Sequence, residues 1–272
     1  MLRSMYSGVS GMRGFQTKLD VIGNNIANVN TVGFKSGRVM FKDIMSQTVS
    51  GVTAPVDGGA GGSNAKQVGL GVSIGSIDTL QTAGSAQTTN NPLDLRIDGD
   101  GFFMVKLTGD QDVAYLTRAG DFHLDGARNL VTSDGLHVCD SNGDPITLED
   151  NVTSFTISQD GTVVEKLDDG TTTAGPQIGV AKITNPEALE KIGGNLYRMT
   201  LNASADGTYE PTTANNGETG TGAIVSGQLE MSNVDLTGEF TEMIVAQRGF
   251  QANSRIITTS DEVLQEVVNL KH

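Results

Sequence analysis

Residues 236–268 read LTGEFTEMIVAQRGFQANSRIITTSDEVLQEVV, and apolar side chains recur in this stretch at steps of four and three. The spacing predicts a helix with a heptad seam, about 50 Å long at 1.5 Å per residue. The seam consists of Leu236, Phe240, Met243, Phe250, Ile257, Leu264 and Val268. A second stripe widens the apolar surface and consists of Ile256, Val263, Val267 and Leu270. A helix with two apolar stripes needs more than one partner.

Residues 2–26, at the other end of the chain, carry an apolar stripe that predicts a helix over residues 2–24. The stripe consists of Leu2, Met5, Val9, Met12, Phe15, Leu19, Ile22 and Ile26. Gly8, Gly11 and Gly14 lie within it, and because each costs about 1 kcal/mol relative to alanine, the helix is marginal by itself. A cluster of asparagines follows and ends the helix, since asparagine binds local backbone and tolerates left-handed dihedral angles.

The middle of the chain has the pattern of antiparallel β structure. Short apolar runs alternate there with Asp-Gly and Asn-Gly pairs, which are strong local signals for hairpin turns. Residues 68–74 alternate apolar residues with glycine and serine, which predicts one strand with a nearly bare face that another backbone can approach. Residues 185–187, Asn-Pro-Glu, predict the start of a short helix that Gly193 and Gly194 end.

These patterns together predict the α+β class, with a discontinuous terminal helical coiled-coil domain and a mainly antiparallel β domain. We expect the helical domain to comprise residues 1–30 and 234–272. An extended arm with a glycine-rich loop is expected over residues 31–67, and the β-rich domain over residues 68–233.

Two arrangements of the terminal helices are compatible with the sequence. In the first, both helices pack on the body of their own subunit, as amphipathic helices commonly do. In the second, they pack on helices of neighbouring copies. We expect the second, because polar turn sequence separates both stripes from the β domain and an isolated glycine-rich helix pair is weak. The two ends would then be largely unfolded in the monomer and ordered on assembly, with the stripe residues as the subunit interface.

The formal net charge of −14 argues against nucleic acid as a general partner, because binding to phosphate needs a basic surface. Residues 1–48 carry a net charge of +4, residues 234–272 carry −3 and the middle carries −15. Cys139 is the only cysteine in the sequence, so no internal disulfide framework is expected. No apolar run has membrane length and the first residues do not resemble a signal peptide, so we expect neither membrane insertion nor a cleaved leader.

Gly71-Val72-Ser73-Ile74-Gly75 matches the G-x-S-x-G pattern, in which the glycines allow a nucleophilic serine to lie on a strained strand-to-helix turn. The surrounding sequence instead predicts a continuous strand, and the chain lacks repeated β-α units. A secreted hydrolase that uses Ser73 is therefore kept only as an alternative. Loss of an enzymatic activity on replacement of Ser73 by alanine would support it.

Two other groups of residues were considered as chemical sites. His137 and Cys139 share one face of a predicted strand, with His123 upstream, but no second cysteine or closing ligand accompanies them. A buried structural cysteine is the simpler interpretation. Residues 98–101, Asp-Gly-Asp-Gly, resemble the start of a calcium loop, but Gly109 stands where an EF-hand has glutamate. The sequence therefore predicts no catalytic residue, no metal site, no cofactor and no enzymatic activity.

Residues 19–35, LDVIGNNIANVNTVGFK, resemble the N-terminal signature of bacterial flagellar rod and hook proteins. Further segments similar to motifs of that family are residues 98–103 (DGDGFF), 117–122 (TRAGDF), 227–236 (GQLEMSNVDL) and 243–248 (MIVAQR). The residues of this sequence that match the family signature are Asn24, Asn25, Asn28, Thr31, Gly33, Phe34 and Lys35. The resemblance spans essentially the whole chain, and long motifs in the right order at both ends are highly specific.

Residues 19–35 look most like the short-form flagellar hook protein, whereas residues 46–66 lie where distal rod proteins carry an extra stretch. The resemblance implies a homopolymeric hook, a flexible tube that joins rod to filament and transmits torque as a universal joint. The alternative is a distal rod subunit, which belongs to a stiff drive shaft. Terminal helices would form an inner coiled-coil wall and the β domains an outer layer.

The same resemblance implies where the protein acts and what it contacts. It implies an extracellular location in the hook and basal body of the bacterial flagellum, and a role in motility. The expected partners are the flagellar type III export apparatus and the rod, hook cap and hook–filament junction proteins.

Overall fold

The computed structural model describes residues 2–55, 61–108, 111, 113–149, 151–204, 207–209 and 211–270. The chain divides into two compact units. Unit 1 comprises Met1–Ala27, Gly37–Thr79 and Asp235–His272, and unit 2 comprises Asn28–Ser36 and Leu80–Val234. The chain therefore passes from one unit to the other four times. Two terminal helices and mostly antiparallel sheets confirm the predicted α+β class.

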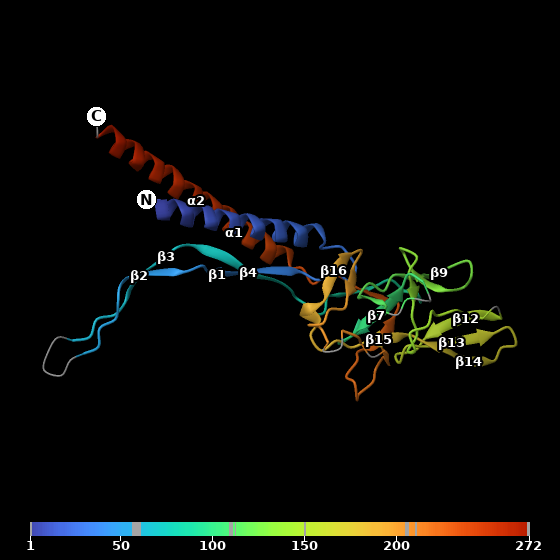
Figure 1. Ribbon diagram of the computed structural model, residues 1–272. Helices are drawn as coiled ribbons and strands as arrows, with labels where there is room; N and C mark the ends of the chain where they lie inside the picture. The colour runs from blue at the N-terminus through green and yellow to red at the C-terminus, as the bar shows by residue number, and fades with distance from the viewer. Residues whose placement is uncertain are drawn as a thin grey trace. The chain divides into compact units, whose positions relative to one another are not determined.

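Unit 1 is built on two helices, α1 (Leu2–Ala27) and α2 (Leu236–Asn269), which lie side by side (Figure 1). The helices are antiparallel, because the residue numbers rise along one as they fall along the other. The facing pairs are Gly8 with Ile257, Gly11 with Asn253, and Phe15 with Gly249. Neither helix has an apolar stretch of the length needed to cross a membrane, among the residues described.

The local sequence explains where the helices begin and end. α2 follows Asp235, whose side chain accepts a hydrogen bond from the backbone N–H of Thr237 at 3.0 Å and so caps the first turn. α1 ends at Ala27, three residues beyond the predicted end, so Asn24 and Asn25 of the asparagine cluster lie in its last turn. In the turn that follows, the Thr31 hydroxyl donates to Oδ1 of Asn28 at 3.1 Å, and both residues are half-buried.

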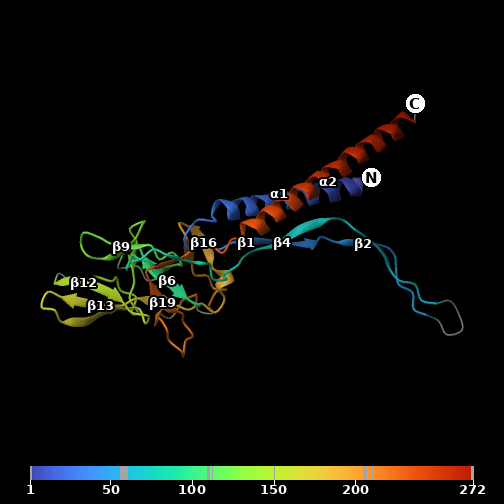
Figure 2. The ribbon, with the colours of Figure 1, turned by 180° about the vertical axis from the view of Figure 1, so that it is seen from behind.

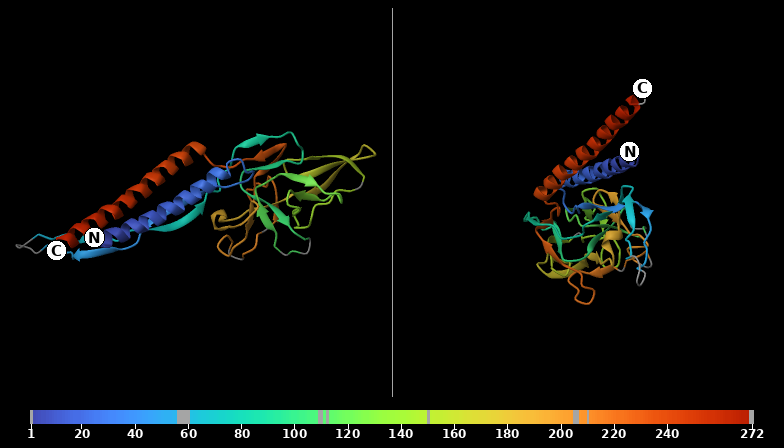
Figure 3. Two further views of the ribbon diagram at one scale, coloured as in Figure 1. Left: turned by 90° about the horizontal axis from the view of Figure 1, so that it is seen from above. Right: turned by 90° about the vertical axis from the view of Figure 1, so that its left-hand side faces the viewer.

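A long β-hairpin completes unit 1 and follows α1 (Figure 3). Its strand pairs are β1 (Gly37–Asp43) with β4 (Val72–Thr79), and β2 (Ser46–Ser50) with β3 (Lys66–Gly69). The single strand expected over residues 68–74 is broken at Gly71, where φ is +136°. The Ser10 hydroxyl of α1 lies where a Cβ on Gly71 would be. Glycine is needed there because of the positive φ and because of this close approach.

The two units divide the chain differently from the boundaries expected from sequence. Residues 68–79 belong to unit 1 and not to the β-rich unit, because β4 pairs with β1. Residues 31–36 belong to unit 2. The expected arm over residues 31–67 is therefore a short segment of unit 2 followed by much of a hairpin in unit 1, and residues 56–60 of its glycine-rich loop lie outside the described residues.

Unit 2 is a β structure, and its main sheet has nine strands in the part of the chain that the structure describes. The order is β16-β17-β8-β7-β11-β10-β9, and β15 pairs with both β7 and β18. The strands are β7 (Phe102–Lys106), β8 (Tyr115–Thr117), β9 (Phe122–Leu124), β10 (Leu130–Thr132), β11 (His137–Val138), β15 (Gly179–Ala181), β16 (Glu190–Gly193), β17 (Leu196–Arg198) and β18 (Pro211–Thr213).

Smaller sheets flank the main one, and Figure 2 shows β6 beside β19 and β12 beside β13. A three-stranded sheet contains β12 (Val152–Ile157), β13 (Thr162–Leu167) and β14 (Thr172–Gln177). Two further pairs are β6 (Leu95–Asp98) with β19 (Ala223–Ser226) and β5 (Ala86–Thr88) with β20 (Gln228–Glu230). All of these pairings are antiparallel.

The turns of unit 2 follow the expected chemistry, with two exceptions. Glycines of four predicted Asp-Gly and Asn-Gly turns have positive φ angles, namely Gly135, Gly143, Gly161 and Gly170. The first exception is the turn at Asp125-Gly126, where Arg128 and not Gly126 has a positive φ. The second is the short helix expected from Asn185, which is only a 3-10 turn, η1 (Pro186–Ala188). The Asn185 side chain makes no cap bond, and the residues from Glu190 onward pair with β17, so the prediction of a helix reaching Gly193 is wrong.

Candidate functional site

The contact between α1 and α2 depends on glycine. A Cβ on Gly11 would lie 2.7 Å from Nδ2 of Asn253, and a Cβ on Gly249 would lie 2.6 Å from Cζ of Phe15. Both distances are shorter than ordinary carbon contacts, so glycine allows these two helices to approach each other. Gly11, one of the residues that weaken α1 as an isolated helix, therefore promotes its packing against α2.

Within unit 1, the predicted interface residues of α1 are mostly covered. Ile22 is buried, and the half-buried members are Met5, Val9, Met12, Phe15, Leu19 and Ile26. The side chain of Leu2 lies outside the described residues. Phe15 packs on Phe41 of β1 with ring centroids 5.7 Å apart. The hairpin and α2 of the same chain thus cover much of this stripe, and its contact with other copies stays a prediction.

The apolar stripes of α2 are much less covered. Of the seam, Leu236, Phe240, Phe250 and Val268 are exposed, and Met243, Ile257 and Leu264 are half-buried. All four residues of the second stripe are exposed, as are Ile244 and Val245, which the spacing analysis misses because they fall between seam positions. Ala246 is the buried residue of this helix. Because burial of a large apolar side chain contributes about 1.5–3 kcal/mol, α2 presents a surface that other molecules can cover favourably.

Asn25, one of the signature residues, holds the end of α1 against β1. Its Nδ2 donates to the carbonyl oxygen of Gly37 at 2.8 Å, and its Oδ1 accepts from the N–H of Gly37 at 2.9 Å. Nδ2 also donates to Oε1 of Glu239 at 2.9 Å. Burial raises the pKa of Glu239, and the bond from Asn25 opposes that shift. The neighbouring Asn24 is exposed.

The second half of the signature lies in unit 2. Gly33 has φ of +69°, and a Cβ on it would lie 2.6 Å from the backbone nitrogen of Ala119, so the position needs glycine. Phe34 is buried, and the ammonium of Lys191 lies 4.9 Å from its ring centroid. Lys191 also donates to the carbonyl oxygen of Lys35 at 2.8 Å. Backbone and side-chain contacts therefore hold this segment in one conformation.

Lys35 belongs to a buried ionic cluster that also contains Glu230 and Arg118. Nζ of Lys35 lies 2.5 Å from Oε1 of Glu230, and Nη1 of Arg118 donates to Oε2 at 3.4 Å. Lys35 and Glu230 are 0% and 1% exposed. Burial lowers the pKa of Lys35, and the carboxylate of Glu230 opposes that shift. The guanidinium of Arg118 lies 5.0 Å from the ring centroid of Phe102.

Backbone groups complete the ionic cluster. The bonds are Lys35 Nζ to the carbonyl oxygen of Thr82 at 2.7 Å, Gly84 N–H to Oε1 of Glu230 at 3.0 Å, and Arg118 Nη2 to the carbonyl oxygen of Gly99 at 3.0 Å. Buried charges tolerate loss of water only when such bonds replace it. The cluster therefore fixes the chain segments that contribute to it.

Four segments that resemble family motifs meet at this cluster, namely residues 31–35, 98–103, 117–120 and 227–236. The sequence analysis names Lys35 as a signature residue but misses the roles of Arg118 and Glu230. Glu230 lies 195 positions from Lys35 and 112 from Arg118, and no local periodicity reports such pairs. The motifs themselves were the available signal, since both missed residues lie within them.

The residues considered for chemistry do not form an active site. Ser73 lies within β4, opposite Lys42 of β1, and not on a strand-to-helix turn, so the hydrolase alternative lacks its nucleophile elbow. Cys139 is fully buried, and burial raises its pKa to about 11, which leaves the thiol protonated and unreactive near neutral pH. The described residues contain no group of three or more His, Cys, Asp or Glu that could hold a metal ion.

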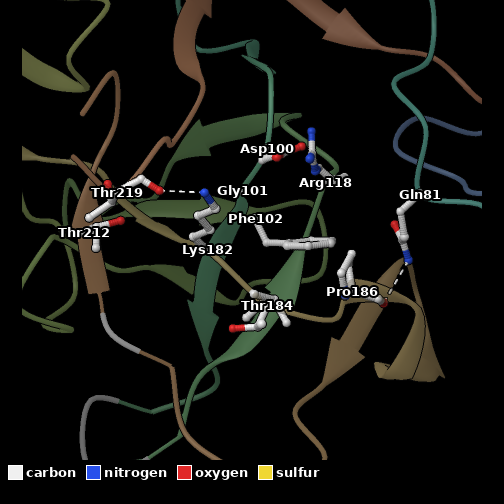
Figure 4. Close-up of a pocket in the computed structure, with 11 residues that line it drawn as sticks. Gln81, Asp100, Gly101, Phe102, Arg118, Lys182, Thr184, Pro186, Thr212 and Thr219 are labelled. Carbon is white, nitrogen blue, oxygen red and sulfur yellow. Dashed lines mark hydrogen bonds between the residues drawn. The ribbon is translucent and has the colours of Figure 1, made fainter. Parts of the chain in front are cut away.

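A pocket of about 490 Å³ in unit 2 is lined mainly by polar residues and glycine (Figure 4). Lys182 points toward Thr219, and its Nζ donates to the carbonyl oxygen of Thr219 at 2.7 Å. Nε2 of Gln81 donates to the carbonyl oxygen of Pro186 at 3.5 Å. The described lining contains no histidine, cysteine or serine, so the pocket offers no familiar pairing of a nucleophile with a base.

Three models of protein families match the chain. They are described as "Flagella basal body rod protein" over residues 5–35, "Flagellar hook protein FlgE/F/G D1 domain" over residues 96–165, and "Flagellar basal body rod FlgEFG protein C-terminal" over residues 225–270. The matched ranges include Asn25, which holds the C-terminal end of α1. They also include Arg118 and Glu230, which belong to the ionic cluster.

Individual relatives agree with these matches. The chain is 58% identical over 272 residues to the flagellar basal-body rod protein FlgG of Bacillus subtilis (strain 168), with 100% of both chains covered. It is 38% identical to the rod protein FlgG of Borreliella burgdorferi, over 100% of this chain and 99% of that one. It is 52% identical to the flagellar hook protein FlgE of Treponema pallidum, over 51% of this chain and 29% of that one. The chain belongs to the flagellar rod and hook protein family.

Proposed function

We propose that this chain is a non-enzymatic structural subunit of the flagellar rod, which assembles with copies of itself into a stiff tubular drive shaft. Identity of 58% over the full length of a rod protein supports the rod, whereas the hook protein FlgE of Borreliella burgdorferi, which also covers 100% of this chain, is 29% identical. The hook expected from residues 19–35 is therefore replaced by the distal rod alternative. The stretch over residues 46–66, where distal rod proteins carry additional sequence, supports the same choice.

The exposed apolar surface of α2 is the observation that carries the assembly proposal. Phe240 is 51% exposed, Val263 is 48% exposed and Val268 is 60% exposed. Each Å² of apolar surface removed from water contributes about 25 cal/mol, so helices that cover these side chains stabilise an assembly. We infer that α1 and α2 of neighbouring copies supply that cover and together form the inner wall of the tube.

The charge of unit 2 suits a solvated outer layer. Its residues carry a net charge of −13, whereas those of unit 1 carry −1. Like-charged units repel one another, so cohesion between copies must come mainly from unit 1. The further partners that we propose are the type III export apparatus and the adjoining rod and hook proteins.

Electron microscopy of the concentrated full-length protein tests the proposal. Straight, stiff tubes are the expected result. Curved tubes would support the hook in place of the rod, and a chain that stays monomeric at every concentration would contradict both. Micrographs of cells that lack the protein provide a second test. If the chain is a rod subunit, these cells should carry no hook, because the hook is joined to the rod.

A further inference from the structure

The chain crosses between the two units four times, and three of the crossings lie close together within unit 2: after Ser36, before Leu80 and after Val234. The fourth crossing follows Ala27. We name the residues next to these places the connecting segments, namely 35–36, 80–84 and 230–234. The N–H of Leu80 donates to the carbonyl oxygen of Ser36 at 2.9 Å, which joins the first two segments directly.

Asn233 joins all three connecting segments through one amide side chain. Its Oδ1 accepts from the N–H of Ser36 at 2.8 Å, and its Nδ2 donates to the carbonyl oxygen of Leu80 at 2.9 Å. Nδ2 also lies 2.9 Å from Oγ1 of Thr82. The side-chain amide of asparagine has an oxygen that accepts and an NH₂ group that donates. In Asn233 the oxygen bonds the first connecting segment and the NH₂ group bonds the second.

The ionic cluster ties the same three segments a second time. Lys35 comes from the first, the carbonyl of Thr82 and the N–H of Gly84 from the second, and the carboxylate of Glu230 from the third. Arg118 anchors the group to the main body of unit 2 through its bond to Glu230. Two separate sets of bonds therefore join the three connecting segments: the buried ionic cluster around Glu230 and the side-chain amide of Asn233.

Unit 2 does not depend on these segments for its apolar core. Both of its hydrophobic clusters are formed by buried residues between Leu95 and Ile224, and no residue of the connecting segments belongs to either. The segments are held mainly by polar bonds. A change that removes one of those bonds can therefore loosen the segments and leave the core folded.

We propose that Asn233 and Glu230 are positioning residues that tie the three connecting segments into one group, and that this tie sets the stiffness of the polymer. The inference rests on the proposed assembly, because torque that passes between the units along the chain travels through four crossings, three of which are at the connecting segments. Each free residue has two soft backbone dihedrals, so three separate segments would bend independently. When they are bonded together, bending requires several buried bonds to break at once.

The experiment compares full-length Asn233→Ala with the wild type and with Thr221→Ala. Thr221 is a matched control, because it is a buried residue of unit 2 whose hydroxyl donates to the carbonyl oxygen of Thr213 at 2.7 Å, away from the connecting segments. Hydrogen exchange at the amide of Ser36 reports the loosened tie, and micrographs give the persistence length of the tubes. We expect Asn233→Ala to accelerate that exchange and to shorten the persistence length, with Thr221→Ala like the wild type in both.

The outcomes separate the inference from the proposed function. Tubes of Asn233→Ala as stiff as the wild type overturn the inference and leave the proposed function standing, and so does equal softening by Thr221→Ala. A wild-type chain that forms no tubes overturns the proposed function itself. If Asn233→Ala does not assemble, Thr82→Val removes only the hydroxyl acceptor of Asn233, and its tubes must have a shorter persistence length than those of the wild type for the inference to hold.

Discussion

The ring of Phe15 lies over the bare backbone of Gly249, with its Cζ 2.6 Å from the position that a Cβ on residue 249 would occupy. Alanine in a helix interior is normally better than glycine by about 1 kcal/mol. At residue 249 the added methyl group forces the ring of Phe15 to move, at a cost of about 1–3 kcal/mol. We expect Gly249→Ala to lower the free energy of unfolding of unit 1 by about 1 kcal/mol, measured from the helical circular dichroism in a urea titration.

Gly23→Ala is the control for that measurement, since nothing lies within 4 Å of a Cβ at that position of α1. This variant should raise the free energy of unfolding by about 1 kcal/mol, the ordinary gain of helix propensity. Equal stabilisation by both variants would mean that α1 and α2 do not pack as closely as the structure has them.

Phe250→Asp should prevent assembly without unfolding unit 2. Phe250 is 37% exposed on α2, so a monomer tolerates a polar side chain there. In an interface, the loss of a buried aromatic ring costs about 1.5–3 kcal/mol, which corresponds to a rise of about ten- to a hundredfold in the concentration needed for assembly. Sedimentation of polymer over a concentration series measures the effect. Gln251→Asp, an exposed neighbour that also becomes acidic, should assemble nearly as the wild type does.

Asn25→Asp should weaken the attachment of α1 to β1. The carboxylate cannot donate to the carbonyl oxygen of Gly37, and it places a second negative charge beside Glu239. Since each buried group left unbonded costs about 1–3 kcal/mol, we expect a loss of about 3 kcal/mol in the free energy of unfolding of unit 1. Gln16→Glu adds the same charge at an exposed position of α1 and should change this free energy by less than about 0.5 kcal/mol. Equal losses in the two variants would assign the effect to net charge.

Local patterns in the sequence predict the elements of this protein better than their partners. The step of three and four residues reveals both terminal helices, and Asp-Gly pairs such as residues 134–135 mark turns, because each signal lies within a few residues. The regular spacing of Gly8, Gly11 and Gly14 can be read from the sequence, but the groups that pack against these glycines cannot. Whether such glycines weaken a helix or admit a neighbour depends on the neighbour, which the local pattern does not name.

Pairings across the chain could not be predicted for the same reason. The hairpin of β1 and β4 and the bond between Lys35 and Glu230 join residues that are far apart in sequence, and either partner alone resembles many other exposed residues. A lysine at residue 35 would ordinarily be placed on the surface. Only the presence of Lys35 in a family motif, one of four whose segments meet at the cluster, indicates that it is not. Sequence therefore predicts the candidate interface of α2 more directly than the ionic cluster.

Glu230→Gln should destabilise unit 2 more than the double variant Lys35→Met with Glu230→Gln. The single change leaves the ammonium of Lys35 buried without its carboxylate, and loss of one partner of a buried pair costs about 3–5 kcal/mol. Methionine fills a similar volume without a charge, so the double variant should recover at least about 1 kcal/mol of that loss. Denaturant titrations followed by near-ultraviolet circular dichroism measure unit 2. A double variant less stable than Glu230→Gln would argue that Lys35 is held by its backbone bond and not by the ion pair.

The thiol of Cys139 should make unit 2 less stable in alkaline solution. Burial raises its pKa from an ordinary 9.0 to about 11. Between these two values the unfolded chain has released the thiol proton and the folded chain has kept it, so the folded state binds more protons and its free energy of unfolding falls as the pH rises. Two pKa units correspond to a limiting loss of about 3 kcal/mol, of which about 2 kcal/mol is reached by pH 11.

Cys139→Ala separates this effect from those of other titrating groups. The variant should be less stable than the wild type at pH 8, because the smaller side chain leaves a cavity where Cys139 is fully buried. Its further loss between pH 9 and pH 11 should nevertheless be smaller than that of the wild type by about 2 kcal/mol, since tyrosines such as Tyr197 and lysines such as Lys35 titrate in both proteins. Parallel curves for the two proteins would mean that the thiol can ionise inside the fold. In that case a thiol reagent should label Cys139 without unfolding, whereas a sealed thiol is labelled only as fast as unit 2 opens.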